Sequence, residues 1–211
     1  MDVKRGPQTK AQMRRAPEQA RSRDRVEQIL AAATELIRLT GSEQMTMSAI
    51  AKKAGMSLPS IYRYFPDKSA LIQTLANQYM ALVRVGIEQA LAGVDGPKEA
   101  RVALRSMIRT YWLLYRSEPA YRDVLTAMQA DRRLALSELE DSRTAAALLD
   151  AKLHGLVPVE VEGKLDTLTL LGTHLTAAVM RLALLTDESE GEALVEAWID
   201  IVCATLLDSK A

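Results

Sequence analysis

Apolar residues recur every three or four positions along most of the chain, which is the spacing of amphipathic helices. The first clear stripe runs from Val26 to Thr40, and Gly41 follows it as a C-terminal stop. Further helices are predicted at about 47–54, 58–64, 68–92, 97–116, 119–129, 131–153, 162–185 and 189–208. Since no segment alternates cleanly enough for a strand, the pattern predicts an all-α fold.

The residues between the first helix and the long helix at 68–92 are typical of two short helices joined by a sharp turn. Thr46 and Ser57 can cap the N-termini of the two short helices. Gly55 between them provides the positive φ that a tight turn requires. Pro66 ends the second short helix, and Asp67 can cap the long one. This arrangement is that of a helix-turn-helix.

Charge divides the chain into a basic head and an acidic body. The formal net charge is zero, yet residues 1–68 hold 13 Lys and Arg against seven Asp and Glu, and residues 69–211 hold 14 against 20. Residues 1–21 are basic and have little to bury, so we expect a flexible arm there. A polyanion would be drawn to the basic end. A solvated basic tail would produce the same counts.

Composition excludes several classes of protein. The single cysteine, Cys203, rules out an internal disulfide framework and a cysteine-built zinc site. The charged N-terminus does not look like a signal peptide, and no uncharged run approaches the roughly 20 residues of a membrane span, so a cytoplasmic protein without a membrane partner is expected. His154 and His174 lie too far apart for a local metal motif, and no glycine-rich phosphate loop is present. We therefore expect neither an enzyme nor a cofactor.

The segment 46–68, TMSAIAKKAGMSLPSIYRYFPDK, resembles the DNA-binding head of the TetR family. The resemblance rests on the Ala54-Gly55 turn, on Ser57, on the Tyr62 to Phe65 core and on the lysine that opens the long helix. It covers roughly residues 25–72. These elements are specific as a set, whereas each of them alone is common.

The resemblance implies that two parts of the chain have different functions. Residues 22–68 would form a three-helix DNA-binding head, and residues 69–211 a helical bundle for ligand binding and dimerisation. The protein would bind a palindromic double-stranded DNA operator as a homodimer. Repression is the simpler expectation for its effect on transcription, and a small, mostly apolar inducer would release it from the operator. The operator sequence, the inducer, the choice between repression and activation, and any contact of the basic arm with DNA stay open.

The predicted DNA contacts lie at helix N-termini or on the third helix, whose opposite face buries Ile61 and Phe65. They are Thr46, Ser57, Leu58, Pro59, Ser60, Tyr62, Arg63, Tyr64 and Lys68. Arg63 is the candidate for bidentate recognition of a guanine. The tyrosines and Lys68 are expected on phosphates, and the small residues allow close approach to base edges. Leu58 has two interpretations: a core residue by periodicity, or a contact to a thymine methyl by resemblance.

The body supplies two further sets of candidates. Aromatic and polarisable residues could line the inducer pocket: Met107, Tyr111, Trp112, Tyr115, Tyr121, Met128, His174 and Met180. Apolar stripes on the last two helices could form the dimer interface: Leu168, Leu171, Gly172, Leu175, Val179, Leu194, Trp198, Ile201, Val202 and Thr205. Ordinary core packing explains either set equally well.

Two rival classes of function remain at this level. An enzyme whose carboxylates are assembled in space leaves no local motif. An all-helical binding protein without DNA affinity would share the helical pattern. Loss of DNA affinity on charge reversal of Arg63 and Lys68 would separate a DNA-binding protein from the latter.

Overall fold

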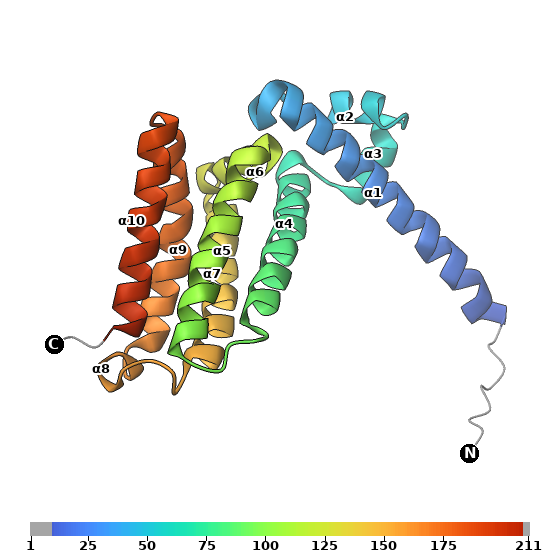
Figure 1. Cartoon of the computed structure of the whole chain (residues 1–211). Coiled ribbons are helices and arrows are strands. Elements are labelled where there is room, and N and C mark those ends of the chain that lie inside the picture. The colour runs from blue at the N-terminus through green and yellow to red at the C-terminus, as the bar shows by residue number, and fades with distance from the viewer. Residues whose placement is uncertain (1–9, 209–211) are drawn as a thin grey trace, which may run out of the picture. The chain divides into compact units, whose positions relative to one another are not determined.

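Figure 1 shows a computed structural model that describes residues 10–208, with side chains from Arg21 onward except those of residues 132 and 133. Every regular element in this range is a helix, as predicted. The chain forms two compact units that divide after Leu71. The first unit is the helix-turn-helix head and the second is the helical body.

The head contains three helices. They are α1 (Lys10–Gln44), α2 (Met47–Lys53) and α3 (Leu58–Tyr64). Gly41 interrupts α1 with a φ of 81°, so the predicted stop breaks the helical geometry although helical residues follow it. Gly55 has a φ of 64° in the turn between α2 and α3, as the turn requires.

Side chains cap the short helices in the predicted way. The Thr46 hydroxyl accepts from the Ala49 amide at 3.2 Å, and the Ser57 hydroxyl accepts from the Ser60 amide at 3.4 Å. Each hydroxyl thereby accepts from an amide of the first helical turn, and the Ser60 amide also donates to the Ser57 carbonyl oxygen at 3.0 Å. The Asp67 carboxylate likewise accepts from a backbone amide in the first turn of the long helix that follows, at 2.7 Å.

The predicted basic arm differs from the structure. Helix α1 begins at Lys10, so residues 10–21 are helical rather than irregular. An irregular arm was predicted because this stretch has few apolar residues to bury. It is, however, rich in Ala, Arg and Gln, which have high helix propensity. Residues 1–9 of the predicted arm lie outside the described residues.

The body begins within the long helix α4. Its helices are α4 (Lys68–Leu91), α5 (Pro97–Ser117), α6 (Pro119–Ala130), α7 (Arg132–Leu153), α8 (Val159–Glu162), α9 (Leu165–Leu184) and α10 (Glu188–Leu207). Helix α9 packs between α7 and α10, α10 packs against α5, and α6 packs on α7 and α5 (Figure 1). The four-residue α8 was not predicted, because one turn is too short to show periodicity.

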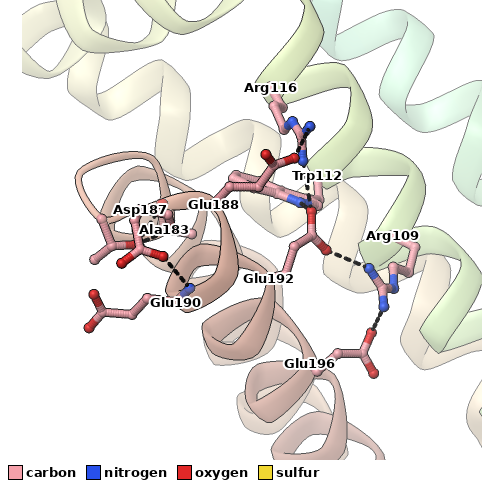
Figure 2. A network of polar contacts seen from close by, with 10 residues as sticks. Arg109, Trp112, Arg116, Ala183, Asp187, Glu188, Glu190, Glu192 and Glu196 are labelled. Carbon is pink, nitrogen blue, oxygen red and sulfur yellow. Dashed lines mark hydrogen bonds and ion pairs between the residues drawn. The ribbon is translucent and has the colours of Figure 1, made fainter.

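Charged side chains line the contact between α5 and α10 (Figure 2). Arginines recur along α5 and acids recur every four residues along α10, so each set forms one stripe on its helix. The pairs are Arg101 with Asp208, Arg105 with Glu196 and Asp200, Arg109 with Glu192 and Glu196, and Arg116 with Glu188 and Glu192. We call this set the α5–α10 ladder.

Candidate nucleic-acid interface

Helix α3 presents a polar face on an apolar base. Ile61 is completely buried and Phe65 is 5% exposed, whereas Tyr62 is 47% exposed. Ser57, Pro59, Ser60 and Arg63 are exposed as well. The alternation follows from helical spacing, since residues three or four apart share a face. The polar face is therefore available to a partner.

Leu58 belongs to the exposed side of α3. Its exposed fraction is 37%, which excludes the interpretation as a core residue. Leu58 is the first residue of a seven-residue helix, one turn before the buried Ile61. An exposed leucine at this end can provide an apolar contact for a thymine methyl.

Arg63 is held by its neighbour in the structure. Its Nη2 donates to the Tyr64 hydroxyl at 3.0 Å, and its guanidinium carbon lies 5.1 Å from the centre of the Tyr64 ring. An arginine over an aromatic face gains a cation–π attraction. Tyr64, predicted as a phosphate contact, thus has the second effect of restricting the conformers of Arg63.

Lys68 also has an intramolecular partner. Its Nζ donates to the backbone carbonyl oxygen of Glu43 at 3.0 Å. This bond ties the start of α4 to the end of α1, so Lys68 has a structural role in the head besides the predicted phosphate contact. Lys52 and Lys53 are both exposed, and Lys53 pairs with Glu35 of α1.

Sequence reasoning missed residues that support the turn. The Gln28 Nε2 donates to the Ala54 carbonyl oxygen at 2.9 Å and so fastens the turn to α1. Ser48 lies beside Thr46 with their hydroxyl oxygens 3.1 Å apart, at the N-terminus of α2. The Gln28 contact spans 26 residues and leaves no local signal in the sequence. Ser48 is exposed and could have been included as a neighbour of the cap.

The predicted ligand-lining residues do not form one group. Tyr111, Tyr115 and Tyr121 lie together and are joined by Tyr79 of α4, with ring centroids between 5.0 and 6.1 Å apart. The Tyr121 hydroxyl donates to that of Tyr111 at 3.1 Å. Burial raises the pKa of Tyr111 to about 12 and also raises the pKa values of Tyr115 and Tyr121. The hydroxyls are therefore neutral donors at physiological pH.

The other candidates lie elsewhere in the body. The Trp112 Nε1 donates to Glu192 on α10 at 2.8 Å, so its indole belongs to the α5–α10 contact (Figure 2). His174 is exposed, and its Nδ1 lies 3.1 Å from the Ser142 hydroxyl oxygen. Met128 and Met180 are fully buried, and Met107 is partly exposed.

An open hollow of about 380 Å³ lies near the start of α5, away from the tyrosines. It is lined by Gly93, Val94, Lys98, Val102 and Ser106, among others. None of the predicted ligand-lining residues borders it. This hollow is therefore distinct from the tyrosine group that was predicted to hold a ligand.

Helices α9 and α10 expose apolar side chains. Leu171, Leu175 and Ile201 are 50%, 42% and 55% exposed. Thr205 is exposed, and partial exposure is found at Leu168, Gly172, Val179, Leu194 and Trp198. By length and composition α9 could cross a membrane, and only 17% of its apolar window is buried within the chain. These helices therefore carry an apolar surface that the chain itself does not cover.

Val202 is the exception among the predicted interface residues. It is 8% exposed and belongs to the buried stripe that also contains Val195, Ile199 and Leu206. The prediction placed it with Ile201, but neighbouring residues on a helix are about 100° apart and face different surroundings. Val202 therefore lies in the core of the body and not on the exposed stripe.

Comparisons with known proteins agree with this architecture. Residues 29–75 match the family described as bacterial regulatory proteins, tetR family, and residues 98–209 match the tetracyclin repressor-like C-terminal domain. The HTH-type transcriptional regulator EthR of Mycolicibacterium smegmatis is 27% identical over 196 residues, covering 87% of this chain and 88% of EthR.

Solved structures share the fold. A TetR-family transcriptional regulator from Streptomyces coelicolor has a TM-score of 0.68 at 20% identity, covering 87% of this chain and 96% of its own. The transcriptional regulator FadR from Bacillus subtilis, in complex with stearoyl-CoA, has a TM-score of 0.65 at 19% identity, covering 85% and 98%. Because the match to the C-terminal domain alone spans more than half of the chain and the head matches separately, this protein belongs to the TetR family of transcriptional regulators.

Proposed function

We propose that this regulator is a cytoplasmic homodimeric repressor. It binds a palindromic operator through α3 and leaves the operator when a small, mostly apolar ligand binds in the body. The observation that carries the proposal is the exposed polar face of α3 above the buried Ile61 and Phe65. Catalysis, a cofactor and a metal ion have no part in it.

The proposed DNA contacts divide into two kinds. Arg63 reads a base edge, with Ser57, Pro59, Ser60 and Leu58 at the end of α3 that approaches the groove. Phosphate contacts come from Tyr62, Tyr64, Thr46 and Lys68. For Lys68 the contact requires its ammonium group to hold the Glu43 carbonyl and a phosphate together, which its three donors allow.

A homodimer is proposed for two reasons. Helix α3 has seven residues and is about 10 Å long, so a single head reads only a few base pairs. Two heads on a symmetric dimer read two half-sites and so gain specificity. The uncovered apolar side chains of α9 and α10, with Leu171, Leu175 and Ile201 at their centre, supply a surface for self-association.

The proposed ligand site is the tyrosine group of the body. FadR, which shares the fold, was solved with stearoyl-CoA, a molecule with a long apolar tail. In this chain Tyr111, Tyr115 and Tyr121 offer aromatic surface and neutral donors. We further propose the functional boundary at 68–69, three residues before the division of the two compact units.

Selection of bound fragments from random DNA tests the function. The full chain should enrich a sequence with two-fold symmetry, and its affinity for that sequence should fall steeply with salt, because Lys and Arg displace counterions from phosphates. Equal affinity for the enriched and a scrambled sequence at physiological salt would contradict the proposal. Retained affinity after charge reversal of Arg63 and Lys68 together would contradict the assignment of the interface to α3.

A further inference from the structure

Three buried side-chain atoms of the body have no hydrogen-bond partner among the described residues, and one of them, Glu196 Oε1, is ion-paired with Arg109. The other two belong to groups of opposite charge. Arg181 Nη1 and Asp141 Oδ2 have no hydrogen-bond partner among the residues that the structure describes. The other carboxylate oxygen of Asp141 accepts from Arg84 Nη1 of α4 at 3.1 Å. Native proteins pair nearly all buried polar atoms, because an unpaired one costs stability. An unpaired guanidinium nitrogen is therefore a candidate for ligand recognition.

Arg181 lies beside the tyrosine group. Burial raises the pKa values of Tyr111 and Tyr115, and the positive charge of Arg181 opposes the rise at both hydroxyls. At Tyr115 a side-chain hydrogen bond with Arg181 opposes it as well, so Nη1 is the guanidinium nitrogen that is left unpaired among the described residues. Because the Tyr121 hydroxyl donates to Tyr111, the hydroxyl hydrogen of Tyr111 points elsewhere. The guanidinium and this hydroxyl together provide two kinds of donor beside aromatic rings.

The charged side chains around the tyrosine group determine which of them could bind an anionic ligand. Asp141 is neutralised by Arg84, and the carboxylate of Glu138 accepts from Gln129 Nε2 at 3.1 Å. Arg122 donates to the backbone carbonyls of Tyr115 and Arg116 and is thereby occupied. Of the cations around the tyrosines, Arg181 is the one with a buried nitrogen left unpaired among the described residues.

We propose that the ligand of the body is an aromatic carboxylate whose carboxylate group pairs with Arg181 while its ring packs among Tyr111, Tyr115 and Tyr121. The inference rests on the proposed ligand site and makes its chemistry more specific. A guanidinium offers a planar pair of donors that matches a carboxylate. The edge-to-face contacts of the tyrosines show the geometry in which an additional ring would be received.

A matched pair of probes tests the inference on the unmodified full chain. Naphthalene-2-carboxylate and naphthalene-2-carboxamide have the same ring, and only the first is an anion. Binding is measured by calorimetry at pH 7. The carboxylate should bind at least about tenfold more tightly than the amide, as expected when one charged hydrogen-bonded contact is added. Equal affinities, or no measurable binding of the carboxylate, would overturn the proposal without any variant.

Substitution of Arg181 then tests whether this residue binds the carboxylate group. Arg181→Gln should lower carboxylate affinity to that of the amide and leave amide affinity unchanged, and Arg181→Lys should retain part of the preference. The control is Arg143→Gln, which removes an exposed arginine of α7 that pairs with Glu140. Circular dichroism checks that each variant folds. An unchanged preference in folded Arg181→Gln would show that another group holds the anion.

Measuring the affinity for the selected operator in the presence of each probe distinguishes a failure of this inference from a failure of the proposed function. If naphthalene-2-carboxylate binds through Arg181 but DNA affinity stays the same, the anion site is supported and the release mechanism is wrong. If the carboxamide releases the operator as well as the carboxylate does, the release mechanism stands and the Arg181 anchor is wrong.

Discussion

Glu192 is the central residue of the α5–α10 ladder, and its removal should destabilise the body measurably. Its Oε1 accepts from Trp112 Nε1 at 2.8 Å and from Arg116 Nη1 at 2.9 Å, and its Oε2 accepts from Arg109 Nη1 at 2.8 Å. The two arginine side chains are 43–45% exposed and can be rehydrated, so each pair contributes only a few tenths of a kcal/mol.

Trp112 accounts for most of the expected loss of stability, because this residue is only 3% exposed. Without Glu192 its indole N–H is left buried and unpaired, which costs about 1–3 kcal/mol. We therefore expect Glu192→Ala to lower the free energy of unfolding by about 2–3 kcal/mol. Glu192→Gln keeps an acceptor for the indole and should cost about 1 kcal/mol.

Urea unfolding followed by circular dichroism measures these values. The control is Glu140→Gln, which affects an exposed pair on α7 and should cost at most about 0.5 kcal/mol. In a Trp112→Phe background the loss of unfolding free energy caused by Glu192→Ala should fall below about 1 kcal/mol, because no indole N–H is then left without an acceptor. An undiminished effect in that background would refute the reasoning.

The cost of Glu192→Gln should also depend on pH. The hydrogen bond from Trp112 lowers the pKa of Glu192 below its ordinary value of 4.5, and the hydrogen bond from Arg109 and the positive charges of Arg109 and Arg116 act in the same direction. A carboxylate with a lowered pKa in the folded state stabilises the protein fully above the unfolded pKa, and this contribution is lost as the pH falls through the folded pKa. The difference between wild type and Glu192→Gln should be constant above pH 4.5 and shrink below it.

Four other substitutions test the interface assignments and the packing. Arg63→Ala should relax preference at one base position by about 1–3 kcal/mol, whereas Tyr62→Phe should weaken all sequences alike; uniform weakening by both, in binding to an operator library, would make Arg63 a phosphate contact. Leu175→Glu places a charge on the exposed stripe of α9 and should yield monomers in analytical ultracentrifugation, an outcome that a persisting dimer would contradict. Gly191→Ala would bring Cβ within 2.6 Å of a backbone carbonyl oxygen of α9 and should cost about 1–3 kcal/mol in urea unfolding, whereas an unchanged midpoint would show that the helices can separate freely.

The local features of the head could be predicted because each depends on residues close in sequence. Caps at Thr46, Ser57 and Asp67 require only a side chain and an amide three residues later. Gly41 and Gly55 have the positive φ expected of helix ends and turns. The division of α3 into a buried and an exposed face follows from helical spacing alone.

Contacts between distant helices could not be predicted in the same way. Periodicity predicted a core position for Leu58 and the family resemblance an exposed one, and the folded chain exposes it. It also could not place Trp112 on the α10 side of α5 and Tyr111 among the tyrosines, although the two residues are adjacent. Arg181 was missed because an unpaired buried atom is defined by its surroundings, and these come from several helices.

Helix α5 joins the two parts of the body that the proposed mechanism must couple. One face carries Tyr111 and Tyr115, which belong to the proposed ligand site, and another carries the arginines of the α5–α10 ladder. Several charge-assisted bonds resist sliding of α10 along α5, so a displacement of α5 by a ligand would carry α10 with it. Because α10 exposes Ile201 on a different face, that displacement would reach the apolar surface proposed for the dimer. Removing Glu192 would loosen this connection, so Glu192→Gln should weaken ligand-induced release more than it weakens ligand binding or operator binding.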